Sequence, residues 1–182
     1  MEELLNYTEL LIDPAQTPEA IASLHDLKKQ IFQLKNKKNK LGSQMIPAGY
    51  SDLRQAFHAH RKEAKKISGI CSYLLLFYAA ECGLKSIYLK QKKLSTTDKI
   101  QDQALLSKDG HNLDRWVKEL KISANQVGAT PHFHLAKGGS SLDIEKVHQV
   151  WRYGIKIKAE DEKKLVEWLE NICNYIEENI NR

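Results

Sequence analysis

Cysteine, proline and glycine are scarce in this chain, which holds only 3, 4 and 9 of them among its 182 residues. An all-β protein needs many turn residues, so these numbers favour a helical protein. The three cysteines, Cys71, Cys82 and Cys173, lack the spacing typical of a metal site. They indicate reduced thiols, and we therefore expect the protein in the cytoplasm.

Long hydrophobic runs are also lacking. The run ICSYLLLFYAA ends at Glu81 after 11 residues, whereas a helix that crosses a bilayer needs about 20. The N-terminal stretch MEELLNYTELL is acidic and has neither the basic region nor the cleavage site of a signal peptide. From these two features we expect no membrane segment.

Acidic residues are in the minority, with 23 Asp and Glu against 28 Lys and Arg, for a net charge of +5. A modest positive excess suits an acidic partner such as RNA, and it also suits a lysine-rich solvated surface. The densest basic cluster is KNKKNK at residues 35–40, which indicates either a phosphate-binding patch or a solvated helix end. The candidate nucleic-acid-binding residues are its lysines, Lys35, Lys37, Lys38 and Lys40.

The stretch from Ile67 to Lys90 predicts a helix at the centre of the fold. One helical stripe of apolar residues predicts its buried face, namely Ile67, Cys71, Leu74 and Tyr78. The same stripe continues to Glu81 and Lys85, which are four residues apart and can pair along the helix. Because buried charges are costly unless paired, they indicate either a structural ion pair or the floor of a polar site. Gly83 predicts a close crossing with another helix.

Periodic apolar residues predict further helices on both sides of this one. Their approximate ranges are 21–41, 51–67, 112–121, 142–153 and 159–180. We expect the helix at 51–67 to run on into the central helix with a bend at Gly69, and residues 123–141 to form a long loop. Residues 1–45 then form an amphipathic helical region that pairs with a partner or a second protomer. Residues 51–182 form an all-α, up-and-down bundle of about five or six helices.

His148 and Arg152 project from one face of the helix expected at 142–153, and Tyr153 follows directly. Repulsion by Arg152 favours the neutral form of His148, which could then act as a base near neutral pH. Arg152 could stabilise a phosphate or a developing oxyanion. The alternative is that Arg152 pairs with Glu81 inside the bundle while His148 lies on the surface.

Two other histidine groups have simpler explanations. Arg54 and His60 are a second candidate catalytic pair, or part of a solvated helix surface. His132 and His134 alternate as zinc ligands on a strand do, but a zinc site needs a third ligand and only His111 is near in sequence. We therefore expect no metal and no cofactor.

Several pieces of the sequence together resemble the HEPN superfamily of small helical-bundle proteins. In chain order they are FYAAECGLKSIYL, GHNLDRWVKEL, VHQVWRYG and a long terminal amphipathic helix. The resemblance covers roughly residues 51–180 and rests on the helix with Glu81-x-x-x-Lys85 and on the order of the later pieces.

This resemblance implies a helical, often dimeric protein. Many members are metal-independent ribonucleases of toxin–antitoxin, abortive-infection or other antiphage systems, and others are inactive binding or regulatory modules. The family's catalytic pattern is Arg followed four to six residues later by His. Here only Arg54 and His60 have that order at a matching spacing, whereas His148 precedes Arg152.

Two functions follow as expectations. The first is an RNA-binding HEPN-like endoribonuclease that works without metal. Its catalytic residues would be His148, Arg152 and Tyr153, supported by Glu81, Lys85 and His111. The second is a non-catalytic interaction or dimerisation module that binds a protein partner through its long first helix.

Overall fold

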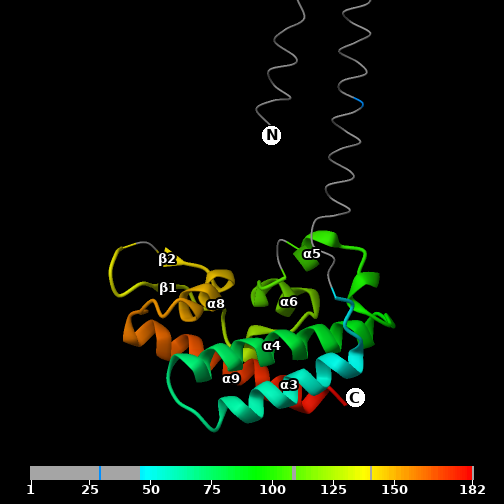
Figure 1. Cartoon of the computed structure of the whole chain (residues 1–182), viewed down its shortest axis with the longest axis horizontal. Helices are drawn as coiled ribbons and strands as arrows, with labels where there is room; N and C mark the ends of the chain where they lie inside the picture. Colours follow the sequence, from blue (N-terminus) through cyan, green and yellow to red (C-terminus); the bar gives the residue numbers. More distant parts are fainter. Residues whose placement is uncertain (1–28, 30–45, 108–109, 140, 182) are drawn as a thin grey trace, which may run out of the picture. The chain divides into compact units, whose positions relative to one another are not determined.

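The computed structural model describes residue 29 and residues 46–107, 110–139 and 141–181 (Figure 1). The chain divides into two units at Ile46–Pro47, and the fold below is that of the second. Apart from residue 29, the predicted amphipathic region at 1–45 lies outside the described residues, and so do the candidate RNA-binding lysines, Lys35, Lys37, Lys38 and Lys40.

Helices account for most of the described residues, which confirms the predicted all-α character. The long helices are α3 (Tyr50–Ala64), α4 (Ile70–Gln91) and α9 (Ala159–Asn179). The shorter ones are η1 (Thr97–Lys99), α5 (Gln103–Ser107), α6 (Leu113–Glu119), α7 (Ala124–Val127) and α8 (Ile144–Arg152). The described part thus has seven α-helices, more than the five or six expected.

A small hairpin lies in the segment predicted to be a loop. Strand β1 (Phe133–His134) pairs with β2 (Ser141–Leu142) in antiparallel register. Phe133 is fully buried, so this segment is fixed to the core. Strands of two residues leave no period of alternating hydrophobicity, which is why the sequence pattern did not indicate them.

Helix α4 is the central helix, as predicted, and it contacts α3, α6, α8 and α9 (Figure 1). The predicted buried stripe is wrong at its start, because Ile67 is 47% exposed and Cys71 is exposed as well. The second half of α4 is instead buried on every side, from Leu76 to Leu89, apart from half-buried positions such as Lys85. A helix surrounded by neighbours carries apolar residues on all faces, so no single stripe marks its core.

Helices α3 and α4 are separate, which corrects the expected continuous helix with a bend. Helix α3 ends at Ala64, and the chain then reverses so that α4 runs back along α3 (Figure 1). Gly69, the residue before α4, has a φ of +77°, a left-handed conformation that side chains other than glycine rarely adopt. The predicted bend at Gly69 is therefore part of a complete reversal of the chain direction.

The close helix crossing expected at Gly83 is confirmed. A Cβ atom added there would lie 2.6 Å from Cγ2 of Ile176 on α9 and 3.0 Å from Cδ2 of Phe57 on α3. Only glycine lets three helices approach so closely at this point. The crossing holds α4 in a fixed register, and Glu81 and Lys85 lie on either side of it.

Helix α4 is also long and apolar enough, by length and composition, to cross a membrane. Half of its most apolar window is buried inside the unit. The core helix of a globular unit has the same length and composition, so this property is weak evidence for a membrane span.

Candidate functional site

The candidate site is built on Glu81, which joins two other segments of the fold. Glu81 is only 8% exposed. Lys85, one turn along α4, donates from Nζ to Oε1 of Glu81 over 2.6 Å, which confirms the predicted pair. The other oxygen, Oε2, lies 2.8 Å from Nδ1 of His111, a residue of the loop before α6. One buried carboxylate therefore holds both a lysine and a histidine.

Lys85 is fully engaged in this arrangement. Its side chain is 14% exposed, and Nζ lies 5.5 Å from the centroid of the Trp116 ring on α6. The aromatic face and the carboxylate together compensate the ammonium charge, which a partly buried lysine requires. Lys85 thus supports Glu81 and has little freedom to reach a ligand.

Glu81 is held in its charged form. Burial alone raises its pKa, but the hydrogen bond with His111 and the charge of Lys85 outweigh burial, so that the pKa lies below its ordinary value. An ionised Glu81 accepts a hydrogen bond from Nδ1–H of His111 and so fixes that tautomer. The second ring nitrogen, Nε2, is then the one left to exchange protons.

His111 is the accessible histidine of the group, with a side chain that is 53% exposed. Its position follows from the start of α6, where the Asn112 side chain accepts a hydrogen bond from the Arg115 backbone at 3.1 Å. Asparagine is a favoured N-cap residue, and it fixes the residue just before the helix. His111 therefore lies directly before the first turn of α6.

His148 on α8 is the second histidine, and its position corrects the expectation of a surface residue. It is 4% exposed and lies between Phe77 and His111, with ring centroids at 5.4 and 4.4 Å respectively. Its Nδ1 is buried and has no hydrogen-bond partner in the described part of the chain. The backbone of Glu145, one turn earlier, acts to raise the pKa of His148, but it forms no hydrogen bond with Nδ1.

The ring of His148 is neutral at physiological pH. Burial, followed by the positive charge of His111, lowers the pKa of His148 to about 4. Glu81 acts in the opposite direction, and Arg152 adds to the lowering. The two adjacent histidines therefore lie in different environments. His111 is exposed and bonded to a carboxylate, whereas His148 is buried and neutral.

Arg152 and Tyr153 lie at the surface, at the C-terminal end of α8. Nη2 of Arg152 is 3.1 Å from the Tyr153 hydroxyl, and the guanidinium lies over the Tyr153 ring at 5.0 Å. Arg152 forms no ion pair with Glu81 or with any other carboxylate of the described residues. The alternative with Arg152 buried against Glu81 is therefore wrong.

The other candidate residues have different neighbours. On α3, Arg54 bonds to Asn181 at 3.3 Å, and the His60 ring lies 6.3 Å from that of Tyr78. His132 and His134 each pair with a separate carboxylate, Asp143 at 2.9 Å and Asp161 at 2.8 Å. Within residues 46–181, as far as they are described, no group of three His, Cys, Asp or Glu residues is arranged to hold a metal ion.

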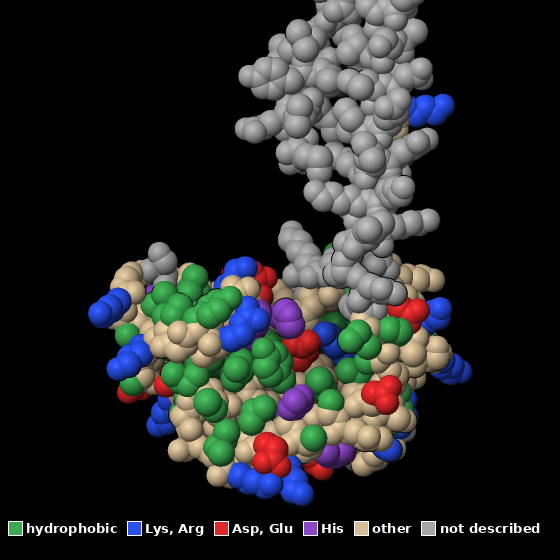
Figure 2. Space-filling view, viewed as in Figure 1, with side chains coloured by type: hydrophobic (Ala, Val, Ile, Leu, Met, Phe, Trp, Pro, Cys, Tyr) green, Lys and Arg blue, Asp and Glu red, His purple; other side chains and the backbone are tan. Residues whose placement is uncertain are grey.

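The cluster of Glu81, Lys85, His111 and His148 reaches the surface over α4. Figure 2 shows histidine, acidic and basic side chains next to one another there, between α6 and α8. A polar cavity of about 320 Å³ lies beside it and is lined by residues that include Asn112, Thr130, His132, Ile144 and Glu145. Asn112 and Glu145, the neighbours of the two histidines, also hydrogen-bond to each other at 3.4 Å.

Comparison with family models, with curated proteins and with solved structures gives no match. The chemistry of the site therefore rests on its own geometry, in which an exposed imidazole is oriented by a buried carboxylate. That arrangement suits proton transfer.

Proposed function

We propose that this protein is a HEPN-like, RNA-binding protein that cleaves RNA without a metal ion, with His111 as the general base. The observation that supports this most is the contact of 2.8 Å between exposed His111 and buried, ionised Glu81. A carboxylate behind an imidazole orients the ring and stabilises its protonated form, the same assistance that the aspartate of a serine protease supplies.

RNA suits these groups because it carries its own nucleophile. His111 Nε2 would take the proton of a ribose 2′-hydroxyl, whose oxygen then attacks the adjacent phosphorus. The 5′-oxygen of the next nucleotide leaves with a proton from solvent, and a 2′,3′-cyclic phosphate remains. A guanidinium stabilises the extra negative charge on the phosphorus oxygens. Arg152 is suited to this role because it is exposed and has no carboxylate partner in the described residues.

The roles within the predicted set change accordingly. His148 was expected to be the base, but a ring that is 4% exposed with a pKa of about 4 is poorly suited to it. In this proposal His148 is the neutral neighbour that packs against His111 without repelling its protonated form. Tyr153 assists Arg152 through the hydroxyl contact at 3.1 Å. Glu81 and Lys85 keep their supporting roles.

The test is cleavage of a 5′-labelled single-stranded RNA by the purified full chain in EDTA. We expect wild type to leave 2′,3′-cyclic phosphate ends, and His111→Ala to be slower by at least about a hundredfold, the usual effect of losing a positioned base. Glu81→Gln should also be impaired, and 2′-O-methyl RNA should stay intact.

His134→Ala is the matched control, because His134 is also a histidine bonded to a carboxylate, Asp161 at 2.8 Å, and is not among the residues that line the polar cavity. It should cleave like wild type. If wild type leaves RNA intact, or if His111→Ala cleaves as fast as wild type, the catalytic proposal is wrong. The non-catalytic interaction module expected as the alternative would then be retained.

A further inference from the structure

A second surface, separate from the histidine cluster, lies between the β1–β2 hairpin and the connection from α8 to α9. The two segments are held together by the backbone, with Ala136 N donating to Lys156 O at 2.8 Å and Lys158 N to His134 O at 2.9 Å. Leu135 and Ile157 form an antiparallel bridge at the same place. This surface is therefore a rigid part of the fold.

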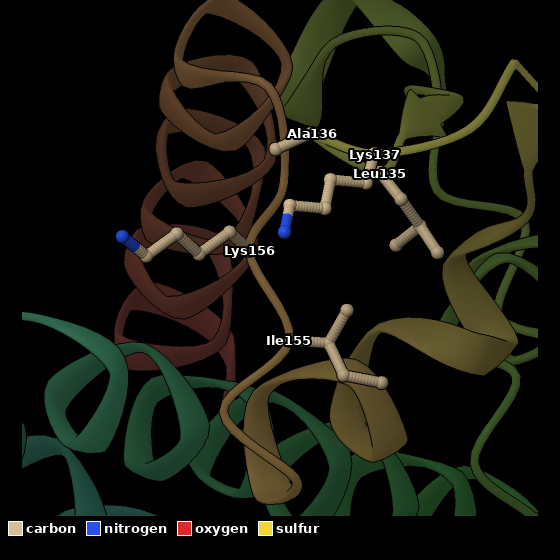
Figure 3. Close-up of a pocket in the computed structure, with 5 residues that line it drawn as sticks. All are labelled: Leu135, Ala136, Lys137, Ile155 and Lys156. Carbon is tan, nitrogen blue, oxygen red and sulfur yellow. The ribbon is translucent and has the colours of Figure 1, made fainter.

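A cavity of about 300 Å³ lies on this surface and is lined by Leu135, Ala136, Lys137, Ile155 and Lys156. Leu135 and Ile155 point into it from opposite sides, while Lys156 points away (Figure 3). Its volume is at the lower end of the range for ligand pockets, about 300–1,000 Å³. The aliphatic walls suit an aliphatic side chain better than a phosphate or a sugar.

Large apolar side chains are exposed around this cavity. Ile155 is 41% exposed, and Tyr153, two residues earlier, is 67% exposed. They are two of the four large hydrophobic residues that the described part of the chain leaves exposed. Figure 2 shows hydrophobic side chains gathered over β1 and α8, with lysine or arginine side chains on both sides of them. Apolar surface with a polar rim is typical of an interaction site.

The charge of the rim indicates the kind of partner. Lys137 and Lys156 line the cavity, and neither of them forms an ion pair with a carboxylate of the described residues. Of the carboxylates at the start of α9, Asp161 bonds to His134 at 2.8 Å, and Glu162 accepts a hydrogen bond from Nε1 of Trp151 at 3.1 Å. The surface therefore has positive charges that the fold does not compensate, and a negatively charged partner complements them.

We infer that this cavity binds an acidic peptide segment of a partner protein, which inserts an aliphatic side chain between Leu135 and Ile155. Acidic side chains of the segment pair with Lys137 and Lys156 at the rim. The aliphatic contact supplies the buried apolar surface, and the charges supply the selection against basic segments. The inference is independent of RNA cleavage at His111.

The experiment uses the purified full chain and three labelled 12-residue peptides, read by fluorescence anisotropy. The first peptide contains Glu and Leu, with the Leu residues spaced three and four apart so that they share one face of a helix. The second has Lys in place of every Glu, and the third has Ser in place of every Leu. We expect the Glu/Leu peptide to bind at least tenfold more tightly than either of the others, roughly the effect of one lost anchor or of reversed charge.

Two variants test whether the peptide binds at this cavity. Ile155→Ser should weaken the Glu/Leu peptide at least tenfold, and the double variant Lys137→Glu/Lys156→Glu should reverse the preference toward the Lys/Leu peptide. Ile67→Ser is the matched control, because Ile67 is exposed to a similar extent, 47% against 41%, and belongs to a different segment. It should bind like wild type, and thermal melts of all variants verify that they are folded.

Single-stranded RNA and anionic lipid vesicles are the competing partners, and both are tested with the same variants. If Ile155→Ser weakens binding to RNA or to vesicles and leaves the Glu/Leu peptide unaffected, the inference is wrong. It is also wrong if the Glu/Leu peptide fails to bind wild type, or binds Ile155→Ser as tightly as wild type. RNA cleavage by the Ile155→Ser variant should equal that of wild type, so the two proposals stand or fail separately.

Discussion

The rings of His111 and His148 lie with their centroids 4.4 Å apart, tilted by 36°, although 36 residues separate them in the chain. Glu81 bonds directly to His111 and only influences His148 through its charge. Two like side chains in contact therefore lie in different environments, since His111 is exposed beside a carboxylate and His148 is buried. The predictions below test this difference and the packing that produces it.

The pH dependence of the free energy of unfolding should reveal the lowered pKa of His148. Its pKa is about 4 in the folded chain against an ordinary 6.5, so the unfolded chain takes up this proton first as the pH falls. The stability it confers is complete above about pH 6.5 and is lost between about pH 6.5 and 4, by up to roughly 3 kcal/mol. Urea denaturation at a series of pH values measures this loss, and His148→Leu should reduce the slope in that window.

The protonation of Glu81 should affect stability at lower pH than that of His148, so the two losses can be compared in one experiment. Its pKa is lowered by its partners, so the stability it contributes is present above about 4.5 and is lost as the pH falls further. The His148→Leu variant should keep this second loss. An unchanged slope between pH 6.5 and 4 in this variant would show that His148 titrates normally.

Removing the charges of the pair should have unequal effects. Glu81→Ala leaves the largely buried Lys85 ammonium without its carboxylate, so we expect a loss of roughly 3–5 kcal/mol in the free energy of unfolding. Lys85→Met keeps the volume and leaves Glu81 its contact with His111, so its loss should be clearly smaller. Denaturation at pH 7 measures both, and equal losses would mean that His111 does not compensate Glu81.

Gly83→Ala should destabilise the fold although alanine is the better helix former by about 1 kcal/mol. The added Cβ would lie 2.6 Å from Ile176 and 3.0 Å from Phe57, and such overpacking typically costs about 1–3 kcal/mol. The double variant Gly83→Ala/Ile176→Val should recover part of the loss. Gly139→Ala is the control, since nothing lies within 4 Å of a Cβ there. A stabilised Gly83→Ala protein would contradict the close crossing.

Tyr50→Phe should loosen the end of α9. The Tyr50 hydroxyl donates to the Ile180 carbonyl at 2.6 Å, and removing a hydrogen bond of this kind costs about 0.5–1.5 kcal/mol. Amide hydrogen exchange of the last turn of α9 should therefore accelerate more than exchange in α4. Uniform acceleration across all helices would indicate a global effect instead.

The parts of the site that lie within one helix could be predicted from sequence. Glu81 and Lys85 are four residues apart, so helical geometry alone brings them together. The contact of Glu81 with His111 spans 30 residues and depends on where α6 packs, which no local pattern encodes. The only available signal was the position of His111 directly before the N-cap Asn112.

The burial of His148 shows a second limit. The apolar spacing of Ile144, Val147 and Trp151 predicts the inward side of the helix, and all three are buried, but His148 is buried as well. A helix of nine residues that packs against both α4 and α6 has a wide buried face, so a polar residue at its edge is enclosed as well. Exposure of such an edge position depends on neighbouring elements rather than on periodicity.

The contact between Tyr50 and Ile180 has a consequence for the connectivity of the chain. It brings the start of α3 and the end of α9 together, so that the two ends of the helical unit are adjacent (Figure 1). A short linker could therefore join residues 181 and 47, and new ends could be opened at Gly138–Gly139, where an added Cβ meets nothing within 4 Å. Such a circularly permuted protein would keep the order of helices in space while the hairpin beside the apolar cavity is cut. The histidine cluster would then remain intact in a molecule whose second surface has been opened.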